Sequence, residues 1–159
     1  MFFYTFVIRL LQCWQPIIHV NLADDVIRIH SASAKGGRKS GRYETVAITA
    51  NLRPVLDEMN LLRFNPSDYV FGKQLLTSPS SITRNKVSER HAKALKAADL
   101  YNGELTLYSW KHTGVSNAYQ VGADIIWLQK QLRHASLEDT QIYLRSLGLT
   151  PPKPPTVHW

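Results

Sequence analysis

The 159-residue sequence contains a single cysteine, Cys13. One thiol cannot close an internal disulfide, and it cannot form a metal site built from several cysteines. Such a chain is typical of a reducing compartment, so we expect a cytoplasmic protein. The sequence shows no other cluster of metal ligands, and we expect neither a metal nor a small-molecule cofactor.

Long apolar runs are also missing. The longest candidate covers residues 2–14, which is shorter than the roughly 20 residues of a membrane-spanning helix. Arg9 lies within this run, and no basic segment precedes it as one would in a secretory signal. We therefore expect no membrane span and a soluble protein, in which residues 1–18 form a buried helix that ends near Pro16.

Acidic residues are the third scarce group. The chain has 12 Asp and Glu against 19 Lys and Arg, which gives a formal net charge of +7. Such an excess favours a polyanionic partner, either nucleic acid or an anionic membrane surface. Hydrophobic residues make up 44% of the chain, which is enough to bury the core of one compact domain.

Two stretches rich in β-branched and aromatic residues, 25–31 and 42–48, predict strands. The glycine-rich segment 35–41 separates them, so the strands should pair as a hairpin with a basic tip. The basic residues of this tip are Lys35, Arg38 and Lys39.

Apolar residues at helical spacing predict two helices in the middle of the chain. The first should cover residues 51–63, with Leu52, Val55, Leu56 and Met59 on one face. A Pro- and Ser-rich connection over residues 65–81 leads to the second helix, over residues 83–98. Its inward side chains should be Val87, Ala94, Leu95 and Ala98. Its exposed face is strongly basic and carries Arg84, Lys86, Arg90, Lys93 and Lys96.

The last third of the sequence contains clear helix boundaries. A helix should begin near Tyr108 and end before Gly122. Asp124 should cap the next helix. Residues 136–139 resemble a capping box for a further helix, which Gly148 would close. The predicted fold class is mainly α with one small antiparallel β-hairpin.

Three segments of this last third carry the most specific pattern. They read Tyr108-Ser-Trp-Lys111-His112-Thr113, Leu132-Arg133-His134-Ala-Ser136 and Tyr143. The pattern resembles the catalytic domain of the phage integrase (tyrosine recombinase) family. That family has His-x-x-Arg-His-Thr, then Leu-Gly-His-x-Ser, and a tyrosine nine residues after that histidine, as here. The resemblance covers about residues 1–148, and the first segment is similar to mobile-element integrases of the Bacteroides type.

The resemblance implies an enzyme that breaks and rejoins DNA. Tyr143 would attack a DNA phosphate, forming a 3′-phosphotyrosine bond and releasing a 5′-hydroxyl, without ATP or metal. The attack builds negative charge on the phosphate, so the site must supply cations and hydrogen-bond donors. A phenol has a reference pKa of about 10, so the nucleophile also needs a positive environment or a base.

The same resemblance implies a role for each site residue. Lys35 in the hairpin would be the general acid that protonates the leaving oxygen, and Arg9 and Lys111 would hold the phosphate. The supporting donors would be Tyr108, His112 and His134.

The sequence departs from the family pattern at three positions. Tyr108 replaces a histidine, although its hydroxyl can still donate to phosphate. Lys111 replaces the second arginine and keeps the charge without the bidentate grip. Gln12 replaces the glutamate of an Arg-x-x-Glu motif in which Arg9 is the candidate first arginine. We therefore expect weaker stabilisation of the transition state than in the family.

The implied partner is double-stranded DNA, with a homotetramer assembled on it. Phosphate contacts are expected from Arg38, Lys39, Arg84, Lys86 and Arg90. Residues 1–148 would be the catalytic domain, without the separate N-terminal domain of full-length members. Residues 149–159 would form a proline-rich tail, either an element that contacts a neighbouring copy or a short extended arm.

Two other interpretations stay open. Gln12, Lys111 and the missing domain favour a catalytically impaired DNA-binding remnant or accessory protein of a mobile element. A basic helical interaction module, in which Tyr143 is only structural, would bury that tyrosine and place no positive groove around it.

Overall fold

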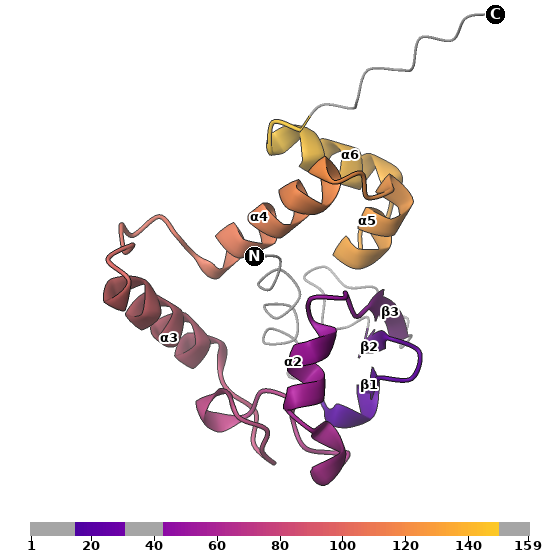
Figure 1. The fold of residues 1–159 in the computed structure, drawn as a ribbon. Helices are drawn as coiled ribbons and strands as arrows, with labels where there is room; N and C mark the ends of the chain where they lie inside the picture. Colours follow the sequence, from indigo (N-terminus) through magenta and orange to yellow (C-terminus); the bar gives the residue numbers. More distant parts are fainter. Residues whose placement is uncertain (1–14, 31–42, 150–159) are drawn as a thin grey trace, which may run out of the picture. The chain divides into compact units, whose positions relative to one another are not determined.

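The computed structural model describes residues 15–30 and 43–149 (Figure 1). The expected N-terminal helix therefore lies almost wholly outside the described residues, as do the hairpin tip and the proline-rich tail. Internal contacts divide the chain after Gly114 into two compact units, and each is described by itself. Within the described ranges, no helix combines the length and the apolar character that crossing a membrane requires.

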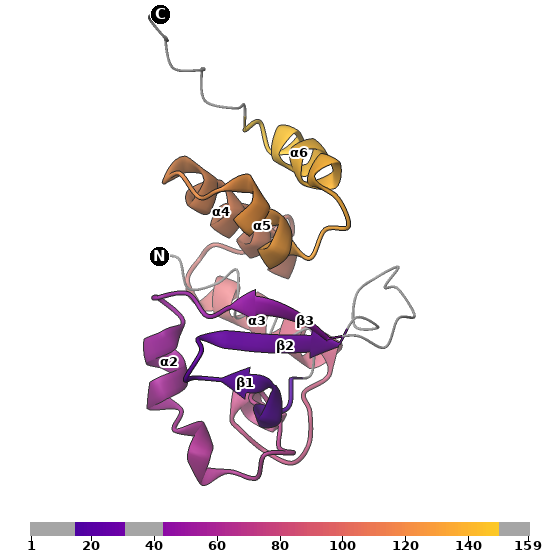
Figure 2. The same ribbon diagram turned by 90° about the vertical axis from the view of Figure 1, so that its right-hand side faces the viewer.

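The first unit contains a three-stranded antiparallel sheet in the order β1-β2-β3 (Figure 2). The strands are β1 (Val20–Asn21), β2 (Val26–His30) and β3 (Tyr43–Ala47). The register pairs Val26 with Ala47 and His30 with Tyr43, so the predicted hairpin is confirmed. Strand β1 was not predicted, because two residues are too short to show an alternating pattern.

The core of this unit lies on one face of the sheet. Alternate residues of β2, Ile27 and Ile29, are buried together with Leu52 and Leu56. These two leucines come from the short helix α2 (Arg53–Glu58) and the residue before it. The predicted helix over residues 51–63 is therefore confirmed only in its first part. Its other two expected core residues, Val55 and Met59, are half-buried.

The chain leaves α2 through a backbone change that the sequence pattern did not reveal. Asn60 adopts a left-handed conformation with φ of 47°, which asparagine tolerates better than most residues. The 3-10 helix η3 (Leu61–Arg63) then restarts the chain in a new direction. The connection that follows contains a second 3-10 helix, η4 (Lys73–Leu75), and single β-bridges that join Tyr69 to Ser78 and Gly72 to Ser81.

Helix α3 (Arg84–Ala97) confirms the predicted helix and begins at Thr83, whose hydroxyl accepts from the Lys86 amide. Its buried residues are Val87 and Leu95, with His91 half-buried between them. The prediction that Ala94 and Ala98 face inward is wrong, because both are exposed. The inward stripe follows spacing of four residues, which leaves these alanines on another face. The prediction of an exposed basic face is confirmed, because all five of its Lys and Arg side chains are exposed.

The second unit is a small helical cluster. It contains the end of α4 (Leu107–Gln120), which crosses the boundary between the units, and the helices α5 (Ile125–Leu132) and α6 (Leu137–Ser146). Val115, Leu128, Leu132 and Leu144 form its buried core.

The predicted helix boundaries of this region are confirmed. The Asp124 carboxylate accepts from the amides of Ile126 and Trp127. Ser136 and Asp139 form a reciprocal capping box at the start of α6. Gly122 and Gly148 follow their helices with φ of 88° and 72°, in the left-handed region that glycine adopts without strain.

A hydrogen bond between α3 and α4 gives the first unit a pH-dependent contact. Trp110 Nε1 donates to His91 Nε2 at 2.7 Å, which requires that nitrogen to be unprotonated. Burial lowers the pKa of His91. Its stabilising contribution is therefore present above the unfolded-state pKa of about 6.5 and is lost as the pH falls toward the lower folded-state pKa.

We expect the free energy of unfolding to fall between pH 7.5 and pH 5, and to fall less in His91→Gln. Glutamine keeps an acceptor for the indole but does not titrate in this range. Urea titrations of both proteins at the two pH values measure the difference. An equal fall in the two proteins would remove His91 as the cause.

Candidate active site

Tyr143 and His134 lie together in the second unit. Their rings meet edge to face, with centroids 5.5 Å apart and an interplanar angle of 88°. Tyr143 is half-buried and packs against the core of this unit. Packing therefore holds the tyrosine, and part of its side chain still reaches solvent. The interpretation in which Tyr143 is only structural predicted a buried side chain.

The turn before α6 fixes the position of His134. Arg133 ends α5 in a left-handed conformation with φ of 58°. The His134 amide then donates to the Gln129 carbonyl at 3.1 Å, which closes the helix end. Ser136 caps α6 two residues later. Two tight local motifs therefore set the distance between His134 and the helix that carries Tyr143.

Thr140 orients the His134 ring, and sequence reasoning missed it. His134 Nδ1 and Thr140 Oγ1 are 3.0 Å apart, and the Thr140 hydroxyl donates to the Ser136 carbonyl at 3.3 Å. The Thr140 hydroxyl therefore holds the Nδ1 edge of the ring at the start of α6. Thr140 is fully buried, and the only signal in the sequence was a threonine in the first turn of α6.

The remaining described site residues share one face of the first turns of α4. Lys111 Nζ lies 5.4 Å from the centroid of the Tyr108 ring. The rings of Tyr108 and His112 are 6.0 Å apart. Burial, together with the charge of Lys111, lowers the pKa of His112. These residues lie in the first unit, so the structure brings them together as one group and joins His134 and Tyr143 as another.

The exposed basic residues of α3 partly have protein partners. Lys86 Nζ is 2.7 Å from a carboxylate oxygen of Glu89, and Arg90 donates to the Gln74 carbonyl at 2.9 Å. Both side chains are exposed, as is Arg84. The other site predictions, Arg9, Lys35, Arg38 and Lys39, lie outside the described residues. Within the described part, no three His, Cys, Asp or Glu side chains gather as a metal site requires.

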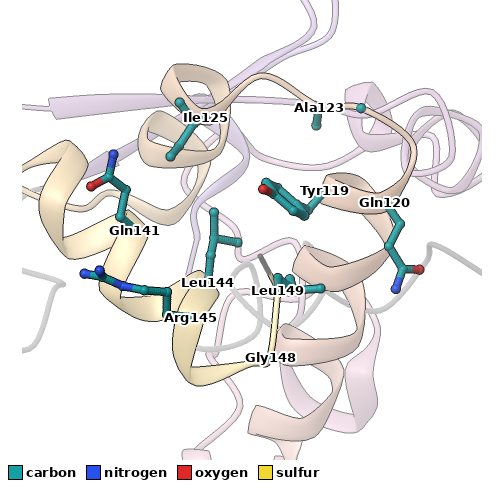
Figure 3. A pocket seen from close by; sticks show the side chains of 10 residues that line it. Tyr119, Gln120, Ala123, Ile125, Gln141, Leu144, Arg145, Gly148 and Leu149 are labelled. Carbon is teal, nitrogen blue, oxygen red and sulfur yellow. The ribbon is translucent and has the colours of Figure 1, made fainter. Parts of the chain in front are cut away.

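The second unit also contains a pocket of about 820 Å³ (Figure 3). One face of α6 lines it through Gln141, Leu144 and Arg145, opposite Tyr119 of α4 and Ile125 of α5. His134 and Tyr143 are not among its lining residues. The pocket is therefore separate from the tyrosine–histidine pair.

Known proteins are similar to this chain in sequence and in fold. A family model described as "Phage integrase family" matches residues 15–148. The crystal structure of XerA recombinase is similar, with 22% sequence identity and a TM-score of 0.63 over 86% of this chain and 47% of that chain. No curated protein sequence matches the chain.

Two structures of XerH site-specific recombinase are similar as well. The post-cleavage complex with palindromic difH substrate shows 17% identity and a TM-score of 0.56, over 88% of this chain and 41% of that chain. The pre-cleavage complex with difH substrate shows 21% identity and a TM-score of 0.55, over 86% and 42%. These likenesses show the fold, and the chain spans less than half the length of the recombinases that it matches.

Proposed function

Because the chain belongs to the phage integrase family, we propose that it is a site-specific DNA recombinase that cuts and rejoins strands through Tyr143. The observation that carries this proposal is the contact between Tyr143 and an oriented His134 on the same small unit. The family pattern has a histidine and a tyrosine at this spacing, and here the two rings are in edge-to-face contact.

In the proposed reaction, the Tyr143 hydroxyl gives its proton to solvent as its oxygen attacks the phosphorus and displaces the 5′-oxygen of the next nucleotide. A 3′-phosphotyrosine bond forms, and Lys35 gives a proton to the leaving oxygen. His134 donates from Nε2 to a non-bridging oxygen, because its Nδ1 edge faces the Thr140 hydroxyl. Attack by the released 5′-hydroxyl of another strand reverses the chemistry and frees the tyrosine.

Arg9 and Lys111 are proposed to hold the same phosphate, with Tyr108 and His112 as further donors. The lowered pKa of His112 favours its neutral form, so most of the positive charge in this group comes from Lys111. An ammonium group offers a point charge where a guanidinium would form two parallel hydrogen bonds.

Lys111→Arg is expected to raise the rate of strand cleavage by roughly tenfold, because two parallel hydrogen bonds grip the phosphate better than one. Lys111→Ala is expected to lower the rate by roughly a hundredfold, as loss of a transition-state donor does. Single-turnover cleavage of a nicked duplex measures both, with Lys130→Ala, an exposed lysine of α5, as the control. An unchanged rate in Lys111→Ala would exclude this lysine from the site.

The proposed partner is double-stranded DNA. Support comes from the net charge of +7 and from the exposed basic face of α3, through Arg84, Lys86 and Arg90. Arg38 and Lys39 of the segment between β2 and β3 are proposed to contact backbone phosphates as well. Such contacts position a protein on DNA without reading its sequence.

We further propose a cytoplasmic enzyme in which residues 1–148 act as the catalytic domain within a homotetramer on DNA. The tail over residues 149–159 would contact a neighbouring copy. Gly148 and Leu149, where this tail begins, line the pocket of the second unit. The competing proposal is a DNA-binding remnant without cleavage activity, which Lys111 at the arginine position favours.

A suicide substrate separates these proposals. The purified chain is mixed with a nicked duplex that carries an end of its mobile element, so that the short cleaved strand diffuses away. Recombinase activity yields a protein–DNA adduct that survives denaturation, in which the 3′ end of the cleaved strand is joined to the protein. Salt-sensitive DNA binding without such an adduct would instead support the remnant.

A further inference from the structure

The outer face of the three-stranded sheet carries a cluster of polar rings and positive charge. Side chains alternate along a strand, so Ile27 and Ile29 enter the core while Arg28 and His30 face outward. His30 pairs in register with Tyr43 on β3, and this pair is the last of the described ladder between β2 and β3.

A second histidine joins this group from the 3-10 helix η1 (Ile17–His19). The His19 ring lies 4.9 Å from the Tyr43 ring, and the His30 ring lies 5.2 Å from it on an edge-to-face contact. The phenol is therefore in contact with two imidazoles. We call His19, Arg28, His30 and Tyr43 the sheet-face cluster.

The members of the sheet-face cluster act on one another electrostatically. The pKa of His19 is lowered by burial, and further by the positive charges of Arg28 and His30. An anion bound among these groups would have the opposite effect, because it favours the protonated imidazoles. Arg28 is exposed, and the other members are half-buried or exposed, so a ligand can reach them.

The acidic side chains of this hairpin occupy other positions than the outward face of β2 and β3. By strand alternation, Glu44 lies on the other face of β3 from Tyr43. At the far end of the hairpin, Asp24 accepts from the Asn21 amide, and Asp25 pairs with Arg53. The outward positions of β2 and β3 are Val26, Arg28, His30, Tyr43, Thr45 and Ala47, and none of these is acidic.

We propose that the sheet-face cluster is a phosphate-binding site that takes a backbone phosphate of DNA. The inference rests on the proposed function, because the segment over residues 31–42, which carries the proposed acid Lys35, joins His30 to Tyr43 in the sequence. A duplex engaged by Lys35 would bring backbone phosphates near these two residues. Arg28 supplies a permanent donor, the Tyr43 hydroxyl a neutral one, and the histidines become donors when protonated.

Phosphate binding at this cluster is linked to proton uptake. The bound anion stabilises the charged imidazoles, so affinity rises as the pH falls from 7.5 to 6.0. The contact also releases counterions from the DNA, so it contributes about one unit to the slope of log K against log salt.

The test uses the full chain and a fluorescein-labelled duplex of mixed sequence. Anisotropy is measured over salt concentrations of about 50 to 300 mM, at both pH values. Arg28→Gln is expected to reduce the salt slope by about one, whereas Arg63→Gln, an exposed arginine of the same unit, keeps it. At pH 6.0, the double variant His19→Gln/His30→Gln is expected to bind the duplex roughly fivefold more weakly than the wild-type protein. Thermal unfolding of each variant checks that the fold is retained.

A wild-type salt slope and pH response in both variants would overturn the proposal. Inorganic phosphate, titrated against the imidazole proton signals of the wild-type protein, separates free phosphate from DNA as the source. If phosphate shifts the signals of His19 and His30 but the duplex does not bind, the site stands and the proposed DNA function fails. If phosphate shifts neither signal and the variants bind DNA like wild type, the site itself is refuted.

Discussion

Tyr143→Phe is expected to abolish the covalent protein–DNA adduct, with a loss of roughly 10⁴-fold or more, because no other group replaces a missing nucleophile. Phenylalanine keeps the ring that packs against His134 and the core of the second unit. The variant should therefore fold and bind DNA like the wild-type protein. Adduct formation on a nicked duplex and anisotropy with an intact duplex measure the two properties separately.

The chain offers a matched control for this substitution. Tyr119 lies in the same unit, is half-buried, and packs against the same core. Tyr119→Phe is expected to leave the adduct unchanged. If Tyr143→Phe still forms the adduct at the wild-type rate, the nucleophile is another residue, and Tyr108 would be the next to test.

The second large effect concerns the core that supports this tyrosine. Leu128→Ala is expected to lower the free energy of unfolding by about 3 kcal/mol, because it deletes buried methyl groups and leaves a cavity. Leu128 is 2% exposed and belongs to the buried core of the second unit, together with Val115, Leu132 and Leu144. Urea titration followed by circular dichroism measures the change.

Ile126 provides the comparison for Leu128, because it lies on the same helix and is 50% exposed. Ile126→Ala is expected to change the free energy of unfolding by less than about 0.5 kcal/mol. Equal losses in the two variants would mean that α5 does not use Leu128 as its main core contact. A smaller loss in Leu128→Ala than in Ile126→Ala would contradict the described packing.

Elements whose boundaries depend on neighbouring residues were predictable from the sequence. The caps at Asp124 and Ser136 and the glycine after α6 act within a few residues, so composition alone indicates them. The early end of α2 was not predictable in this way. It depends on Asn60 entering the left-handed region, a choice that the tertiary packing of the following segment decides.

Some features of the candidate site were likewise predictable from the sequence, and others were not. The family resemblance implied that His134 and Tyr143 belong to one site, and their rings are in contact. The role of Thr140 was missed, because it depends on where a ring nitrogen points after the turn has formed. The contact of His19 with Tyr43 was also missed, because it requires a third strand and a pairing register that no local pattern specifies.

The capping box and the Thr140 hydroxyl make the histidine–tyrosine pair sensitive to chain length in one short interval. A residue advances the helix by about 100°, so an insertion or deletion between Ser136 and Tyr143 would turn the phenol away from His134 while leaving the composition almost unchanged. Each of the intervening positions thus acts as a spacer whose number is constrained even where its side chain is exposed, as at Glu138 and Gln141. Drift in this stretch is therefore expected to proceed by substitution and not by change of length.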